Sequence, residues 1–453
     1  MKISWISPEE LLRYELQQQR EEGKDVASWQ ARWERIQRDA KDETELRSQA
    51  LQLLDELNSL PPSNELRHNE PLALEEILAQ RPNAPPALRQ HALAHEELYD
   101  RILGGWLGRA AGCLLGKPVE KYSREVIKEI LQSNGTWPLS DYITAHGMPE
   151  ELLKRYPWNR HSGKESLKEN IACMTEDDDM NYAMLNLHVL ETCGENFSTE
   201  NVAETWLSLM PVLSTFTAER VAYLNLLAGY RPPQTATHRN PYREWIGAQI
   251  RADVWGWTAP GEPQLAATRA WRDARLSHVR NGIYSEMFFA AALASAFHAE
   301  RVAQIITQGL AQIPQHSRLA HTIQFVLSLH QQEPHWEHAV DRLYEKFGQY
   351  HWVHVLNNAA LVVAALLYGN GDYEKTICNL VMAGWDTDSN GATAGSILGV
   401  MHGARKLPAK WIAPLQNKIR SSMKGFDNST FDDLARRTLQ QAALLHNYNS
   451  EQK

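Results

Sequence analysis

Two short acidic runs could hold a metal ion. The first is TEDDD at 175–179 and the second is DTDSN at 386–390. Each precedes a predicted helix, where one or two carboxylates or hydroxyls would cap the free backbone amides. Capping does not require four consecutive acids, which repel one another, whereas a bound cation would relieve that repulsion. We therefore interpret the two runs as parts of a metal site.

The ligand atoms in both runs are oxygens, which favours Mg²⁺, Mn²⁺ or Ca²⁺ over zinc. The second run also matches the first half of an EF-hand loop, with Asp386, Asp388 and Asn390 at alternate positions. The twelfth position of that loop should be glutamate, and here it is Ile397. The pattern therefore excludes an EF-hand.

Two segments next to these residues carry glycine at every fourth position. They are GGWLGRAAGCLLG at 104–116 and GATAGSILGVMHG at 391–403. A glycine inside a helix costs about 1 kcal/mol relative to alanine, so close approach of another backbone or of a ligand must compensate. Tight helix packing alone would explain the glycines. Their positions suggest more, because the first segment ends near Glu120 and the second follows the acidic run.

In this order the motifs resemble those of the ADP-ribosylglycohydrolase family, over about residues 100 to 405. The family has a glycine-rich helix followed by a glutamate, here Glu120. Its Thr-Asp-Asp-Thr-x-Met motif corresponds to 175–180, and its Asp-Thr-Asp-Thr motif to 386–389. This sequence differs from the family motifs at two positions, with Glu176 in place of aspartate and Ser389 in place of threonine. Both residues still offer an oxygen atom as a ligand. Between these motifs the family has a substrate-facing Asn-Gly segment, which 281–287 resembles.

The resemblance implies an all-α fold with a central cleft that holds two divalent cations, Mg²⁺ in first place and Mn²⁺ as the alternative. Asp178 and Asp179 would orient the ligands from behind. The ligands that the resemblance implies are Thr175, Glu176 and Asp177 on one side and Asp386, Asp388 and Ser389 on the other.

The resemblance also implies roles in catalysis and binding. Glu120 would act as the acid–base group or position the leaving group, and Asp177 or Asp388 would accept a proton from water. Asn281 and the Gly282 amide would hold the ribose or the diphosphate. The aromatic residues Tyr284 and either Trp255 or Trp257 would stack on a base, although a core or lid role suits the tryptophans equally. Arg280 is a candidate for binding phosphate, and His278 and His354 are interpreted as structural.

The function implied is hydrolysis of a ribosyl N- or O-glycosidic bond, with release of ADP-ribose from a modified protein or a small ribosylated molecule. Two alternatives remain open, an N-ribosidase acting on nucleosides or nucleotides and a non-catalytic ADP-ribose-binding protein. The insertion at 229–278 lies outside the shared pattern and leaves the substrate open.

The elements that must position these residues are predicted to be helices. From about residue 97 onward apolar residues recur at helical spacing, which predicts an all-α catalytic domain over 97–445. Residues 1–96 read as a polar helical extension broken by prolines. Its first helix should begin after Ser7, with Glu10 completing a capping box. The stretch 229–261, rich in proline, glycine and tryptophan, is predicted to be a long loop or lid.

Composition narrows the range of partners and locations. The chain has 453 residues and a net charge of −9, which does not favour binding to a nucleic-acid backbone. Its four cysteines are scattered, as expected for free thiols. The N-terminus lacks an apolar signal segment, and the longest apolar run, 359–368, is shorter than the roughly 20 residues needed to span a membrane. We therefore expect a cytoplasmic protein without a membrane partner.

Overall fold

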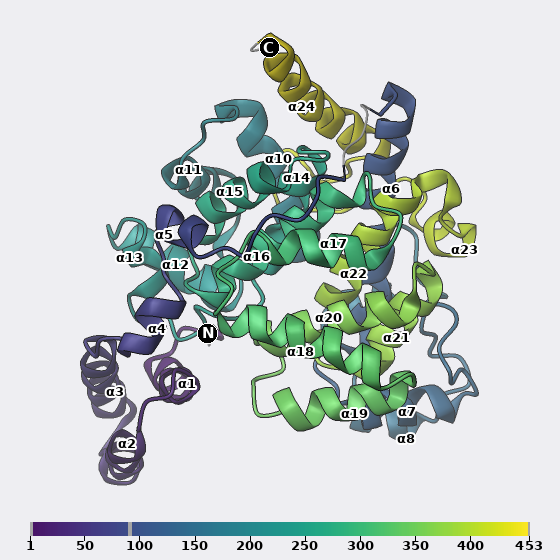
Figure 1. Ribbon diagram of the computed structural model, residues 1–453. Helices are drawn as coiled ribbons and strands as arrows, with labels where there is room; N and C mark the ends of the chain where they lie inside the picture. Colours follow the sequence, from purple (N-terminus) through teal and green to yellow (C-terminus); the bar gives the residue numbers. More distant parts are fainter. Residues whose placement is uncertain (1–2, 89–92, 452–453) are drawn as a thin grey trace.

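The computed structural model describes residues 3–88 and 93–451. Within these residues it contains 24 α-helices and five short 3-10 helices, and no β-strand (Figure 1). This confirms the all-α fold predicted from the helical periodicity. No helix in the described ranges is long and apolar enough to cross a membrane.

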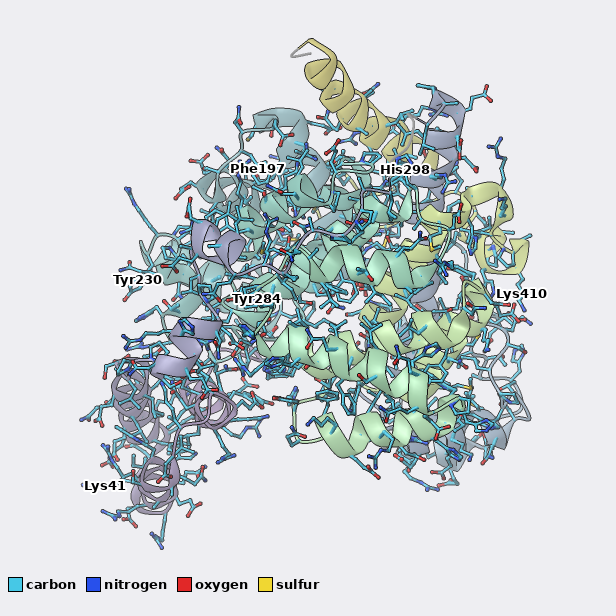
Figure 2. All side chains as sticks on the ribbon, viewed as in Figure 1. Lys41, Phe197, Tyr230, Tyr284, His298 and Lys410 are labelled. Carbon is cyan, nitrogen blue, oxygen red and sulfur yellow. The ribbon has the colours of Figure 1, made fainter. Side chains whose placement is uncertain are left out.

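Five helices precede the main body and form the N-terminal extension. They are α1 (Pro8–Glu21), α2 (Ala27–Asp39), α3 (Glu43–Asn58), α4 (Asn64–Asn69) and α5 (Leu74–Ala79). The first three pack together and project from one side of the body, while α4 and α5 lead back along it (Figure 1). Lys41, between α2 and α3, lies at the outer end of the extension (Figure 2).

The start of α1 was predicted correctly, but its capping was not. The helix begins at Pro8 after Ser7, yet the Ser7 side chain makes no capping hydrogen bond. The Glu10 carboxylate instead accepts a hydrogen bond from the Trp5 amide at 2.6 Å. The predicted capping box is therefore absent, and Glu10 holds the segment before the helix.

The remaining helices make up the body. Those of its first half are α6 (His95–Gly116), η1 (Lys117–Val119), α7 (Arg124–Ser133), α8 (Glu150–Arg155), α9 (Arg160–Glu165), α10 (Asp178–Cys193), α11 (Thr199–Leu209), η2 (Val212–Ser214), α12 (Thr217–Leu227), α13 (Gln234–Thr237), η3 (Gln249–Arg251), α14 (Asp253–Trp257) and α15 (Pro263–Ala274). Those of its second half are α16 (Asn281–Ala296), α17 (Val302–Leu310), α18 (Arg318–Gln332), α19 (Trp336–Phe347), α20 (Val355–Gly369), α21 (Tyr373–Ala383), α22 (Thr387–His402), η4 (Ala404–Lys406), α23 (Ala409–Ile412), η5 (Ala413–Leu415) and α24 (Phe431–Glu451). Every residue of α16 and α20 is buried, so these two helices lie in the core.

The two glycine-rich segments pack against each other in α6 and α22. A Cβ added to Gly112 would lie 2.0 Å from the carbonyl oxygen of Gly391, and one added to Gly108 would lie 2.2 Å from that of Gly395. The two helices pack antiparallel, because successive contacts involve higher residue numbers in α6 and lower residue numbers in α22. Each glycine thus permits a backbone-to-backbone contact that a side chain would block.

Antiparallel pairing brings the C-terminal end of α6 beside the N-terminal end of α22. A hydrogen bond from Thr387 Oγ1 to the Gly116 carbonyl, 2.8 Å long, fixes this junction. Glu120 follows α6 closely, and Asp388 lies in the first turn of α22. The glycine packing therefore places two of the predicted functional segments at the same point in space.

The prediction of a surface loop or lid over 229–261 is wrong for most of the stretch, and only 229–239 lie largely at the surface. Residues 240–260 are buried and include η3 and α14. Arg251, in η3, is fully buried and pairs with Glu219 at 3.0 Å and Asp273 at 3.0 Å. The three tryptophans of this stretch lie in the interior together with Pro241 and Pro260, whereas Pro232 and Pro233 lie nearer the surface.

Candidate metal centre and active site

Carboxylates from three separate parts of the chain converge at the end of α6 and the beginnings of α10 and α22. They form two sets of groups, and within each set the possible ligand atoms lie within 4.8 Å of one another. We call Cys113, Asp177, Asp179 and Asp388 the inner cluster, and Glu120, Asp386 and Asp388 the outer cluster. Asp388 belongs to both.

Two helix N-termini support these acids. Asp177 caps α10, where its Oδ1 accepts a hydrogen bond from the Asp179 amide at 2.9 Å. In the first turn of α22, Asp388 Oδ1 accepts from the Ser389 amide at 3.0 Å. The positive ends of both helix dipoles thus favour negative charge at this point. The same residues therefore cap the two helices and form the carboxylate clusters.

Basic side chains already contact the inner cluster. The buried Lys117 ammonium contacts the Asp177 carboxylate directly. The buried guanidinium of Arg109 pairs with Asp179 at 3.2 Å and with Asp253 at 2.6 Å. A cation bound at Asp177 would therefore have to displace Lys117 from that carboxylate.

The pKa values reflect this crowding of charge. Burial lowers the pKa of Lys117, but Cys113 and Asp388 more than reverse the effect, so its pKa lies above the ordinary value and the ammonium stays charged. Burial, followed by repulsion from Asp388 and Asp178, raises the pKa of Asp179 to about 8 in spite of Arg109. The inner cluster thus lies against two buried cationic side chains, and its Asp179 holds a proton more readily than an ordinary carboxyl group.

The outer cluster fits a divalent cation better. Burial, together with the neighbouring Asp388 and Glu120, raises the pKa of Asp386 well above its usual range. Among the side chains that the structure describes, no basic group forms an ion pair with Asp386 or Asp388. The three carboxylates of the outer cluster offer the hard oxygen ligands that Mg²⁺ or Mn²⁺ prefers. Asn159 Nδ2 donates a hydrogen bond to Glu120 Oε2 and so orients this carboxylate.

The outer cluster faces a narrow cleft. Asp178 and Ser389 line the cleft beside the cluster. Three aromatic residues, Trp5, Phe216 and Trp352, also line it, as does Glu219 at the start of α12. The cleft can therefore hold a polar group at the carboxylates with a flat or apolar group next to it.

Most of the predicted ligands lie at this centre, but Glu176 does not. Ser389 Oγ donates a hydrogen bond to Asp179 Oδ2 at 3.1 Å, and Thr175, two residues before Asp177, is buried. Glu176 Oε1 instead accepts a hydrogen bond from Asn181 Nδ2 at 2.8 Å. Asp179, expected to support the ligands from behind, is itself a member of the inner cluster. Glu176 precedes the N-cap residue Asp177 of α10, whereas Asp179 lies in the first turn of that helix.

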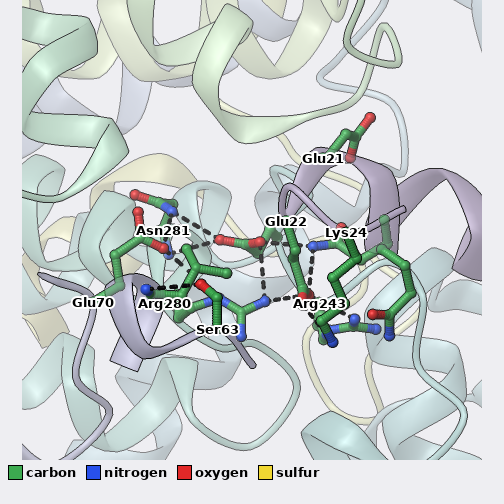
Figure 3. Close-up of polar contacts among 12 residues, drawn as sticks. Glu21, Glu22, Lys24, Ser63, Glu70, Arg243, Arg280 and Asn281 are labelled. Carbon is green, nitrogen blue, oxygen red and sulfur yellow. Dashed lines mark hydrogen bonds and ion pairs between the residues drawn. The ribbon is translucent and has the colours of Figure 1, made fainter. Parts of the chain in front are cut away.

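The residues predicted to face the substrate lie elsewhere. Asn281 Nδ2 donates to Glu70 at 2.9 Å, and both residues are labelled in Figure 3. It also donates to Glu244 at 2.8 Å. Tyr284 is fully buried, and its hydroxyl donates to the Pro71 carbonyl. Neither these two residues nor Gly282 lines the cleft. The reason is that the extension supplies Glu70 and Pro71, which cover this segment.

The other tentative binding residues are also structural. Trp255 and Trp257 are fully buried, and their indole nitrogens donate to Glu286 at 3.0 Å and to Ser396 at 3.2 Å. Arg280, considered for phosphate binding, pairs with acids of the buried network in Figure 3. These side chains therefore stabilise the interior.

Several residues of the site were not predicted from the sequence. The sequence could have indicated Arg109 and Lys117, because charged side chains within or next to a glycine-rich apolar helix need buried partners of opposite charge. There was no such indication for Trp5, Asn159 and Glu219, since nothing in their local sequence links them to the acidic runs. Only the folded chain brings them to the cleft.

Comparisons with known proteins identify the family of this chain. A family model described as ADP-ribosylglycohydrolase matches residues 94–448, which leaves nearly all of the extension outside the match. No curated protein matches the sequence. Among solved structures, an ADP-ribosylglycohydrolase-related protein complex aligns with a TM-score of 0.42 and 20% identity, covering 77% of this chain and 99% of the other.

Proposed function

The chain belongs to the ADP-ribosylglycohydrolase family, and on that premise we propose that it is a metal-dependent hydrolase that releases ADP-ribose from a modified acceptor. The bond cleaved would be a ribosyl N- or O-glycosidic bond. The observation that carries the proposal is the outer cluster, in which Glu120, Asp386 and Asp388 meet at a cleft. Bringing three buried acids together costs free energy, and a bound cation would offset this cost.

The outer cluster would hold a divalent cation, Mg²⁺ in first place and Mn²⁺ as the alternative. Such a cation supplies charge that orients sugar hydroxyls and makes a bound water more acidic. A second cation would use Asp177 with Thr175, after Lys117 has moved from the Asp177 carboxylate. Ser389 would orient Asp179 or contribute its hydroxyl oxygen to the same centre.

The remaining steps of the reaction would be carried out by side chains at the cleft. Asn159 donates a hydrogen bond to Glu120 at the cleft. In its protonated carboxylic acid form Glu120 would give its proton to the oxygen or nitrogen of the departing group and become a carboxylate. Asp388 would accept a proton from the attacking water. We favour Asp388 over Asp177 for this step, because Lys117 already contacts Asp177. Arg109, fixed by Asp253, would hold Asp179 in place.

Product analysis would test this function. The purified full chain is incubated with an N-linked and an O-linked ADP-ribosyl compound and with a nucleoside, each with Mg²⁺, with Mn²⁺ or with EDTA. We expect ADP-ribose release that EDTA abolishes and added Mg²⁺ restores. Release of a free base from the nucleoside alone would instead identify an N-ribosidase. ADP-ribose binding without cleavage of any compound would identify a binding protein.

A further inference from the structure

The segment before α1, residues 3–7, reaches the candidate active cleft. We call this segment the N-terminal arm. Its Trp5 lines the cleft together with Asp386 and Asp388 of the outer cluster. The arm lies outside the region that matches the family model, which begins at residue 94. This wall of the cleft is therefore a feature of the present chain rather than of the matched region.

Polar contacts fix the backbone of the arm. The Trp5 amide donates to Glu10 Oε2 at 2.6 Å, and Arg220 Nη1 donates to the Ser4 carbonyl at 3.0 Å. Arg220 lies on α12, whose first turn contributes Thr217 and Glu219 to the cleft. The arm is thus attached to the same helix that forms another part of the cleft wall.

The indole of Trp5 is packed against other rings but remains partly exposed. Its centroid lies 5.8 Å from those of Tyr14 and Tyr242 and 5.9 Å from that of Trp245. Trp245 in turn stacks on His351 at 4.3 Å. A ring held on one side by such a cluster offers a rigid aromatic surface to the cleft.

Buried ion pairs lock the helix that carries the arm. Arg243 pairs with Glu15 of α1 at 2.7 Å and with Glu22, the residue that follows α1, also at 2.7 Å (Figure 3 shows the Glu22 side of this network). Gln18 of α1 donates to Glu244 at 2.7 Å. Separating α1 from the body would leave buried charges without partners, which costs several kcal/mol. The arm is therefore a fixed wall and not a mobile flap.

We propose that Trp5 is a specificity-determining residue that packs against the group attached to the ribose. Phe216 and Trp352 supply further aromatic surface in the same cleft. The carboxylates of the outer cluster would hold the ribose, so the neighbouring aromatic surface contacts the group that departs. The preferred substrate class is then a small ribosylated molecule with a flat departing group. This inference rests on the proposed function.

The experiment compares two ADP-ribosyl compounds that differ only in the departing group, 4-nitrophenyl in one and methyl in the other. Trp5→Ala should lower kcat/KM for the nitrophenyl compound by about 5- to 100-fold, the range expected for loss of one stacking contact. It should lower kcat/KM for the methyl compound by less than about threefold. Trp5→Phe, which keeps a ring, should recover most of the loss.

Controls separate binding from folding. Trp29→Ala removes a tryptophan of the same extension that does not line the cleft, and it should leave both kcat/KM values unchanged. Calorimetric titration with ADP-ribose, which lacks a departing group, should give the same affinity for the parent and Trp5→Ala. Melting temperatures identify any variant that fails to fold, in which case Trp5→Phe and Trp5→Leu carry the comparison.

The outcomes distinguish the two ideas. Equal losses for both compounds, or weaker ADP-ribose binding by Trp5→Ala, would place Trp5 against the ADP-ribosyl part and overturn this inference alone. Unchanged kinetics in a folded Trp5→Ala protein would overturn it as well. A parent chain that neither binds ADP-ribose nor releases it from either compound would contradict the proposed function, and this inference with it.

Discussion

At the scale of single residues, Asp388 has a special position because both carboxylate clusters share it. Asp388→Ala should abolish calorimetric binding of Mg²⁺ and Mn²⁺. It should also abolish the rise in melting temperature that a cation produces when it binds only the folded chain. Asp341→Ala, at an exposed acid paired with Arg124, is the matched control and should behave as the parent does. Unchanged cation affinity in Asp388→Ala would refute the ligand assignment.

Glu120 is the residue to which we assign the proton transfer. Glu120→Gln keeps the size of the side chain but removes its acid–base function. At saturating Mg²⁺, single-turnover rates should fall by roughly 10²–10⁴-fold. A rate within about threefold of the parent would assign the proton transfer to another group. Loss of cation binding as well would identify Glu120 as a ligand, consistent with its place in the outer cluster.

At the scale of elements, the contact between α6 and α22 positions the whole centre. Gly112→Ala would place a Cβ 2.0 Å from the Gly391 carbonyl oxygen, in a contact where both partners are backbone. The helices must then separate. We therefore expect the free energy of unfolding to fall by about 1–3 kcal/mol and cation binding to weaken.

Gly163→Ala is the matched control for this prediction. Gly163 lies in α9, and its added Cβ would meet its nearest neighbours at 3.6 Å, an ordinary contact. Because alanine favours helices, this variant should melt at the same temperature as the parent or slightly higher. Thermal melts compare the two variants directly. Equal melting temperatures for Gly112→Ala and Gly163→Ala would mean that the α6–α22 contact tolerates a side chain.

At the scale of the whole molecule, buried ion pairs join the extension to the body. Arg243→Met leaves Glu15 without its cationic partner in a fully buried position. We expect a loss of about 3–5 kcal/mol in urea unfolding, the usual effect of breaking a buried pair. Adding Glu15→Gln to that variant should restore part of the loss, because the uncompensated charge is then removed. Surface substitutions typically change the free energy of unfolding by up to roughly 0.5 kcal/mol. If Arg243→Met changed it by no more than this, the result would contradict the stabilising role of the network.

A second link between extension and body should depend on pH. Burial raises the pKa of Glu21, on α1, from 4.5 to about 7. The Glu21 carboxylate lies 3.5 Å from His354 Nε2, and burial lowers the pKa of this histidine to about 3. His354 Nδ1 accepts a hydrogen bond from the Leu356 amide, so its neutral ring carries the proton on Nε2, facing Glu21.

The direction of the pH effect follows from proton binding. Between pH 4.5 and about 7 the folded chain keeps the Glu21 proton that the unfolded chain has lost, so stability falls as the pH rises through this window. Glu21→Gln should remove that decline, with little difference from the parent at pH 4.5 and a gain of about 1–3 kcal/mol at pH 8. Melting temperatures across this range test it, and parallel curves for the two proteins would exclude the assignment.

The sequence by itself determined the features that depend on near neighbours. Helical periodicity predicted the all-α fold, and the Ser-Pro pair predicted the start of α1 at Pro8. Glycine at every fourth position predicted close backbone approach, and the acidic runs predicted carboxylates collected at helix N-termini. Each of these follows from propensities and spacings that act within one or two helical turns.

Only the tertiary structure decided which surfaces meet. The glycines of 104–116 could have packed against many partners, and it is the fold that pairs Gly112 with Gly391. The folded chain brings Asp179 into the inner cluster, whereas Glu176 accepts a hydrogen bond from Asn181 instead. Glu70 of the extension covers Asn281, and Trp5 reaches a cleft whose acids lie far along the chain. Helical periodicity determines which side chains share a face of a helix, whereas the packing of the whole chain determines what that face contacts.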